Sequence, residues 1–371
     1  MRPVVVPFFI SHLGCPHRCV FCDQEKISGS RAALPDTQAI QEKIEAFRAS
    51  APGRQLEVAF YGGSFTALAQ EQQVQLLGTL QPYLAAGTVS SLRISTRPDA
   101  VDHAAVSLLE RMGVGTVELG VQSMNDEVLQ LSGRGHASQD SEQALATLKG
   151  RGFRVGVQLM PGLPGDTLEN SLTSLKRVLQ FAPSFLRIYP TLVVEGTELA
   201  ELYRRGSYRP LPLDEAVAWC KELLKLARRA GVPVVRLGLQ PTEELETPGT
   251  ILAGPFHPAF GQLVESELCC DLMASLLEET APGSEVSFRC TPGRISDLVG
   301  QRRRNLERLT ELFAVRILKV TEDAALDREV IALDGPKGVR LGSLADWEPG
   351  GETPAAPAFV NVGHCHVGRG V

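Results

Sequence analysis

The first 240 residues alternate between two kinds of apolar pattern. Short apolar runs typical of strands are each followed by a longer stretch whose apolar residues recur at helical spacing. Strands are predicted over residues 4–11, 56–61, 92–95, 116–121, 155–159 and 185–189. Repeated βα units form a parallel sheet with helices outside. Because the sequence shows six units rather than the eight of a closed barrel, we expect an α/β fold built on a partial (β/α)6 TIM-like barrel.

The pattern changes after Pro241, where glycines and prolines indicate a loop. Farther on, we predict a helix over residues 264–277, a strand over 286–289, a helix over 296–313 and strands near 315–320 and 330–333. The chain is therefore expected to comprise the partial barrel, residues 1–240, and a small C-terminal α/β appendage, residues 241–348. Residues 349–371 are expected to be a tail that begins with a linker-like run of prolines and glycines.

Composition and charge are those of an ordinary globular protein, with 43% hydrophobic residues, 22% charged residues and a net charge of −6. The mild negative charge argues against a surface dedicated to nucleic acid, although it permits a local basic face. No segment approaches the roughly 20 apolar residues of a membrane-spanning helix, and the apolar start is too short for a signal peptide. We therefore expect a cytoplasmic protein without membrane contact, in which the cysteines stay reduced.

Three cysteines stand close together directly after the first predicted strand. Cys15, Cys19 and Cys22 have the spacing C-x3-C-x2-C, which favours an iron–sulfur cluster held by thiolates. A four-iron cluster with three protein ligands keeps one iron open for a reactant. A structural zinc ion is an alternative, but it needs four ligands, and only His12 and His17 lie near enough in sequence to help. Unrelated core cysteines are a further alternative.

Distinctive residues also follow each of the other predicted strands. In parallel βα barrels the functional groups gather at the C-terminal ends of the strands. These ends carry Gly62-Gly63-Ser64, Thr96-Arg97-Pro98-Asp99, Gln122-Ser123, the run from Met160 to Gly165, and Tyr189-Pro190-Thr191. Together with the cysteine loop they predict one functional rim. His12, Tyr61 and Tyr189 are expected to face the cavity there, either as substrate contacts or as ordinary packing.

These motifs occur in the order of a known family. The segments GCPHRCVFC, YGGSFT, STRPD, VELGVQS, GRGH, QLMPGLPGD and LRIYPTLVVEGTELAELYRRGSY span about residues 10–210. With them the chain resembles the radical S-adenosylmethionine (SAM) superfamily. The resemblance is greatest to the radical SAM part of the catalytic subunit of Elongator and to its stand-alone bacterial look-alikes, which have no acetyltransferase domain.

The resemblance implies two cofactors. Cys15, Cys19 and Cys22 would bind three irons of a 4Fe–4S cluster, and S-adenosyl-L-methionine would chelate the fourth. An electron from a donor such as flavodoxin or ferredoxin would then cleave SAM to methionine and a 5′-deoxyadenosyl radical that acts on the substrate.

The resemblance also implies which residues contact SAM. Gly62, Gly63 and Ser64 occupy the family's glycine-glycine-glutamate position at the methionine end of SAM, where Ser64 departs from the usual glutamate. Arg97 would hold the SAM carboxylate, with an ion pair to Asp99 as the alternative. The remaining predicted contacts are Gln122 and Ser123, toward the ribose or carboxylate, and Phe21, Met160 and Gly162, toward the adenine.

The substrate does not follow from the resemblance. Elongator subunits act on the wobble uridine of tRNA with acetyl-CoA, but only 14 residues precede Cys15, and no acetyltransferase-like region follows the barrel. Oxygen-independent coproporphyrinogen oxidases typically carry a further cysteine at the position of Gln24, which disfavours porphyrin chemistry. We expect an enzyme acting on an RNA base or a small metabolite. The alternatives are a porphyrin-processing radical SAM enzyme and a cluster-bearing RNA-binding protein without radical chemistry.

Arginines near the C-terminus are the best nucleic-acid signal. Arg302, Arg303, Arg304 and Arg308 would lie on one helix, either as a solvated face or as a contact to a tRNA backbone. The tail segment His364-Cys365-His366 concentrates metal-binding residue types, although a tail without a metal role is the simpler interpretation. The remaining cysteines are expected to be buried or without a role. They are Cys220, Cys269, Cys270 and Cys290.

Overall fold

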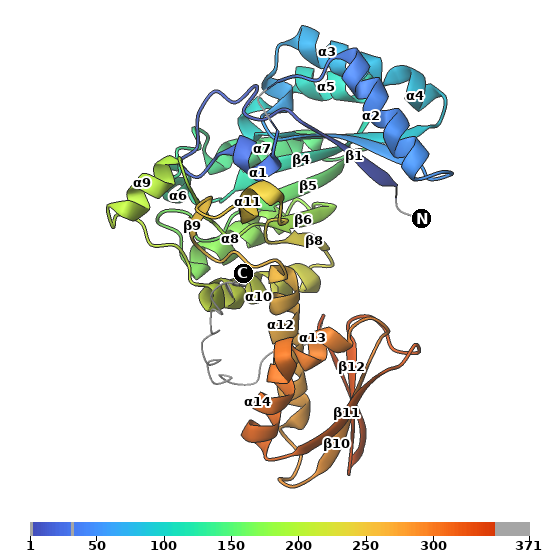
Figure 1. Cartoon of the computed structure of the whole chain (residues 1–371), viewed down its shortest axis with the longest axis vertical. Coiled ribbons are helices and arrows are strands. Elements are labelled where there is room, and N and C mark those ends of the chain that lie inside the picture. Colours follow the sequence, from blue (N-terminus) through green and yellow to red (C-terminus); the bar gives the residue numbers. More distant parts are fainter. Residues whose placement is uncertain (1–2, 31–32, 346–371) are drawn as a thin grey trace, which may run out of the picture. The chain divides into compact units, whose positions relative to one another are not determined.

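The computed structural model describes residues 3–30 and 33–345. The chain divides into two compact units (Figure 1). The first comprises the chain up to Leu211 together with Trp219–Gly261, and the second comprises Pro212–Ala218 and the chain from Gln262 onward. In the described residues, no helix is both long enough and apolar enough to cross a membrane. The predicted tail, with His364-Cys365-His366, lies outside the described residues.

The first unit is built on a curled sheet of seven parallel strands. In sheet order they are β1 (Val4–Phe9), β2 (Leu56–Tyr61), β3 (Val89–Thr96), β4 (Val114–Gln122), β5 (Arg154–Leu159), β6 (Phe185–Ile188) and β8 (Val234–Leu237). All neighbouring pairs run parallel. The expected partial barrel and its six strands are therefore confirmed. The sequence interpretation missed β8, because this edge strand has only four residues and leaves Val235 half exposed.

Helices cover the outer face of this sheet (Figure 1). They are α2 (Thr37–Ser50), α3 (Gln70–Thr79), α4 (Gln81–Ala85), α5 (His103–Arg111), α7 (Ser138–Leu148) and α8 (Leu168–Leu179). The helix starts are fixed by local chemistry, since Asp36 accepts a hydrogen bond from the Ala39 amide and Asp102 one from the Ala105 amide, both at 2.7 Å. Val58, Phe60 and Ile94 are fully buried on the helix-covered face. This apolar layer is the core of the unit.

The opposite, inner face of the sheet is charged, because side chains alternate between the two faces along a strand. Arg93 of β3 lies between Glu57 of β2, at 2.7 Å, and Glu118 of β4, at 2.5 Å. Arg187 of β6 pairs with Glu118 at 2.8 Å and donates to the Tyr189 hydroxyl at 3.0 Å. We call Glu57, Arg93, Glu118 and Arg187 the inner-face network. Its two positive and two negative charges balance.

The second unit contains the predicted small α/β appendage. A four-stranded sheet has the order β11 (Arg316–Glu322), β10 (Glu285–Cys290), β12 (Val330–Gly335) and β13 (Gly338–Ser343). Only the β10–β11 pair is parallel. The buried helix α12 (Phe260–Leu277) covers this sheet so closely that a Cβ on Gly342 would meet Leu272 at 2.8 Å. Strand β13 was missed because Val339 and Leu341 are exposed rather than buried.

The helix predicted over residues 296–313 is wrong as a single element. It is divided into α13 (Ile295–Val299) and α14 (Arg304–Phe313), because Gly300, Arg302 and Arg303 all have positive φ. The bend brings Asn305 inward, where its side-chain amide donates to the Ser266 carbonyl at 2.9 Å. Arg308 pairs with Glu267 at 3.2 Å, so the four arginines do not form one continuous exposed face. Arg302 and Arg303 are exposed at the bend.

Candidate cofactor-binding site

The cysteine loop leaves the C-terminal end of β1 and places the three predicted thiols within electrostatic reach of one another. Cys19 is buried, and Cys15 and Cys22 are half-buried. The loop is held internally, because the Cys22 amide donates to the Cys19 carbonyl at 3.0 Å and the Cys15 amide to the His12 carbonyl at 3.2 Å. In the described part of the chain, no three His, Cys, Asp or Glu side chains lie close enough together to hold a single metal ion.

The thiols influence one another electrostatically. Burial, followed by the neighbouring Cys19 and Cys15, raises the pKa of Cys22 to about 12. Burial also raises the pKa of Cys15, with Cys19 as the next cause, while Arg97 and Arg134 oppose the shift. Three thiolates that are buried near one another need a cationic partner to neutralise their charge. The donor set therefore suits a metal group that binds all three sulfurs.

Arg134 provides part of the positive charge beside the thiols. It follows α6 (Asp126–Leu131) and is buried, and its Nη1 donates to the Cys19 sulfur at 3.2 Å. Its Nη2 donates to the Gly120 carbonyl at 2.6 Å, while its buried Nε has no hydrogen-bond partner in the described structure. The surrounding GRGH segment carries part of the family resemblance, but Arg134 was not predicted as a site residue. A cation within that segment was the usable signal.

Arg97 lies beside Arg134 and forms the ion pair expected as the alternative. Its Nε and Nη2 bind the two Asp99 oxygens at 3.0 and 2.9 Å, and Nη2 also donates to the Arg134 carbonyl. Burial opposes ionisation of Asp99, but the hydrogen bonds from Arg97 outweigh it and lower the Asp99 pKa. Arg97 Nη1 is buried and has no hydrogen-bond partner among the described residues. The two N–H groups of Nη1 therefore remain for an anion, and the predicted carboxylate contact stays a prediction.

The glycine turn after β2 packs directly against the cysteine loop. Gly62 and Gly63 both have positive φ, +71° and +57°. A Cβ on Gly63 would meet the Leu13 carbonyl oxygen at 2.3 Å, so only glycine permits this approach. The Ser64 hydroxyl is fully buried between the Thr96 hydroxyl, at 3.0 Å, and the Arg97 amide, at 3.3 Å. Ser64 thus joins the ends of β2 and β3 through its side chain.

Gln122 and Ser123 have different surroundings despite being neighbours. Gln122 has a φ of +69°, accepts a hydrogen bond from the Gln158 side chain at 3.2 Å, and holds the Met160 amide through its carbonyl at 2.9 Å. The Ser123 hydroxyl instead lies 3.3 Å from the Ser174 hydroxyl of α8 and accepts from the Asn125 amide. The structure therefore joins Gln122 to the Met160 loop and ties Ser123 to the helix layer.

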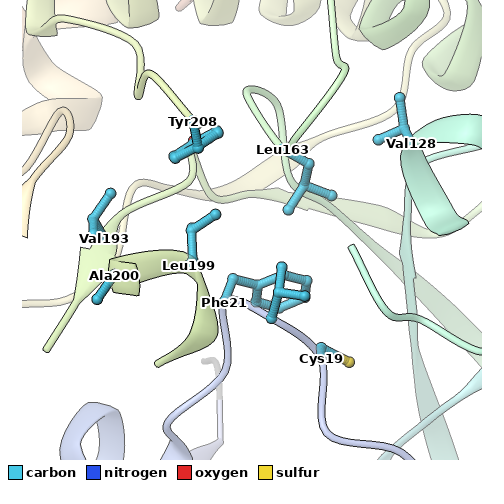
Figure 2. Close-up of a cluster of buried hydrophobic side chains, with 9 residues drawn as sticks. Cys19, Phe21, Val128, Leu163, Val193, Leu199, Ala200 and Tyr208 are labelled. Carbon is cyan, nitrogen blue, oxygen red and sulfur yellow. The ribbon is translucent and has the colours of Figure 1, made fainter. Parts of the chain in front are cut away.

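Phe21 anchors the cysteine loop in an apolar cluster (Figure 2). It is buried with Leu163 of the Met160–Gly165 loop and with Leu199 of α9 (Glu198–Arg204), and Met160 packs against the same cluster. The Cys19 sulfur points away from these apolar side chains in Figure 2. The Phe21 ring thus joins the cysteine loop to the loop that contains Met160 and Gly162.

Gly162 is held on both sides of its peptide backbone. Its amide donates to Asp166 at 2.9 Å, and its carbonyl accepts from the Tyr208 hydroxyl at 2.6 Å. These bonds fix the loop over the apolar cluster. The structure thus groups Phe21, Met160 and the loop that contains Gly162 at the apolar cluster, and joins the glycine turn to Arg97 through Ser64.

Residues 9–178 match the radical SAM superfamily, and residues 183–269 match the radical SAM C-terminal domain. The chain belongs to the radical SAM superfamily. Its family resemblance, inferred from the motifs, is thereby confirmed. The superfamily's cofactors are a 4Fe–4S cluster and SAM, and the three-thiol donor set with two adjacent arginines fits both the cluster and an anionic ligand.

The similar proteins are Elongator-like. A tRNA uridine(34) acetyltransferase of Methanocaldococcus jannaschii is 30% identical, over 57% of this chain and 47% of the relative. Elongator complex protein 3 of Mus musculus is 29% identical, over 50% of this chain and 39% of that protein. The solved archaeal Methanocaldococcus infernus Elp3 with an N-terminal deletion has a TM-score of 0.56 and 26% identity, over 71% of this chain and 62% of that chain. The chain spans about half the length of the curated relatives it matches.

Proposed function

We propose that this radical SAM protein is an enzyme in which Cys15, Cys19 and Cys22 hold three irons of a 4Fe–4S cluster. When bound, the cluster and SAM supply reductive cleavage of SAM to a 5′-deoxyadenosyl radical. The observation that carries the proposal is the convergence of three thiols, Arg134 and the glycine turn at one end of the parallel sheet. The electron would come from a donor such as flavodoxin or ferredoxin.

The chain's own residues would bind and orient SAM. Arg97 Nη1 and Arg134 Nε are buried donors that no described residue satisfies, and an unsatisfied buried donor costs about 1–3 kcal/mol. A carboxylate placed between them would remove that cost. The backbone of Gly62 and Gly63 would approach the methionine end, and the loop carrying Gly162 would hold the adenine.

The inner-face network bears on the substrate. Arg93 and Arg187 are both ion-paired, so neither is free to bind the several carboxylates of a porphyrin precursor without breaking a pair. A neutral, hydrogen-bonding group fits better. We propose an RNA base as the substrate, with a small metabolite as the second candidate. The relatives named as tRNA uridine(34) acetyltransferases support the RNA base.

Anaerobic reconstitution tests the cofactor chemistry. The protein, loaded with iron and sulfide, is reduced with dithionite in the presence of SAM, and 5′-deoxyadenosine is measured by mass spectrometry. We expect it to form in several-fold excess over a control without protein. A fully loaded protein that binds tRNA and yields no 5′-deoxyadenosine would instead be a cluster-bearing RNA-binding protein. Modified nucleosides compared between cells with and without the protein would identify an RNA substrate.

Binding of tRNA is expected to depend on the exposed arginines at the α13–α14 bend. Replacing Arg302 and Arg303 with glutamine should weaken tRNA binding and reduce the slope of log K against log salt by about 1–2, because each phosphate contact contributes nearly one. Filter binding over a range of salt concentrations measures the slope. The matched control is Arg48→Gln, which changes an exposed arginine on α2. Equal slopes for the double variant and the control would place RNA binding elsewhere.

A further inference from the structure

Gln24 links two loops of the site through its side chain, although it belongs to none of the predicted site motifs. It opens the short helix α1 (Gln24–Ser28), two residues after Cys22. Its side-chain oxygen accepts one hydrogen bond from the His12 amide, at 2.6 Å, and a second from the Gly63 amide, at 2.7 Å. Its own backbone amide donates to Nε2 of His12 at 3.0 Å. One carboxamide thus connects two loops that leave different strands.

Both donors to this oxygen belong to backbone in the left-handed region. His12 has a φ of +60° and Gly63 a φ of +57°. Neither amide has a backbone acceptor among the described hydrogen bonds, and the Gln24 side-chain oxygen accepts from both. The Gln24 oxygen also lies 3.2 Å from the position of a Cβ on Gly62, so it packs against the glycine turn itself.

The two loops carry different parts of the site. The His12 carbonyl accepts from the Cys15 amide, so the conformation of His12 is passed directly to the first thiol. Among the hydrogen bonds of the described residues, a single backbone–backbone bond joins the glycine turn to the cysteine loop. The Ser64 amide donates it to the Leu13 carbonyl at 2.8 Å. The Gln24 contacts are therefore a large share of what fixes the turn relative to the thiols.

We propose that Gln24 is a positioning residue, which sets the place of the glycine turn relative to the cysteine loop and so of SAM relative to the cluster. This inference rests on the proposed function. The chemistry requires an acceptor oxygen at the end of a two-methylene side chain that can take two N–H donors at once. Glutamate retains such an oxygen, whereas methionine has the same length and lacks it.

Hydrogen–deuterium exchange in the metal-free protein tests the contacts directly. Gln24→Met should speed exchange of the His12 and Gly63 amides together by about fivefold, since a lost hydrogen bond is worth about 1 kcal/mol. Gln24→Glu should stay within about threefold of the parent protein. Ser28→Ala is the matched control, because it removes the Ser28 contacts with Ser11, at 3.1 Å, and with the Gln24 backbone carbonyl, at 2.7 Å, and leaves the Gln24 side-chain oxygen untouched. If the Ser28 variant speeds both amides as much as Gln24→Met does, the effect belongs to α1 as a whole and the proposal is wrong.

Binding measurements separate positioning from simple stability. In the reconstituted protein, Gln24→Met should retain the parent's iron content but bind SAM about tenfold more weakly, and Gln24→Glu should restore the affinity. Unchanged SAM affinity in Gln24→Met would overturn the positioning role. If the parent protein itself takes up iron but binds no SAM, the proposed function fails, while the exchange experiment still decides whether Gln24 joins the two loops.

Discussion

Replacing Cys19 with alanine is expected to abolish cluster assembly and SAM cleavage. Cys19 is the most buried of the three thiols and the one that receives the Arg134 hydrogen bond. Without its thiolate, only two of the three cysteine ligands remain, and two ligands cannot hold a four-iron cluster. After anaerobic reconstitution, iron should fall from about four per chain to near zero, and 5′-deoxyadenosine should fall below detection.

Cys220→Ala is the matched control for the cysteine prediction. Cys220 lies on α10 (Leu213–Arg229) and is fully buried, so its loss removes a core thiol without touching the loop. This variant should take up as much iron as the parent protein. If Cys19→Ala still formed 5′-deoxyadenosine under dithionite, Cys19 would not be a cluster ligand. Loss of iron in both variants would indicate a folding defect instead.

Local pattern was sufficient to predict every strand of the first unit's sheet except the edge strand β8. Strands such as β2 and β5 are apolar runs with helical repeats after them, and the position of every rim motif follows from where such a run ends. The break between α13 and α14 was not predictable in this way. It depends on Asn305 reaching the Ser266 carbonyl, which lies 39 residues earlier in the chain, and on the positive φ of two arginines, which have no sequence signature of their own.

The site shows the same division between local and distant contacts. The cysteine spacing, the glycine pair and the Arg97–Asp99 pair are local, and each was visible in the sequence. Gln24 and Arg134 act through partners 39 and 115 residues away, Gly63 and Cys19. The residue types alone do not reveal such contacts, because a glutamine or an arginine near a loop is usually solvated. Tertiary structure was needed to give these two residues a place in the site.

Replacing Arg93 with methionine is expected to destabilise the first unit by about 3–5 kcal/mol, the usual cost of removing one partner from a buried ion pair. The Arg93 side chain is only 11% exposed and lies between Glu57 and Glu118. Glu118 would keep Arg187, but among the described residues Glu57 would retain only the Thr116 hydroxyl, at 3.5 Å. The free energy of unfolding, obtained from urea titration of the metal-free protein, measures the loss.

A second substitution tests whether the uncompensated charge is the cause. Glu57→Gln combined with Arg93→Met should recover part of the lost stability, because it removes the buried carboxylate that the single change leaves unpaired. Arg151→Met is the control, since Arg151 pairs with Glu110 at 2.6 Å on the surface, where such pairs contribute little. Should the double variant be no more stable than Arg93→Met alone, packing rather than charge would account for the loss. Recovery would show that the inner-face network requires balanced charge. The proposed preference for a neutral substrate depends on this balance, because a balanced network offers no unpaired cation to an anionic substrate.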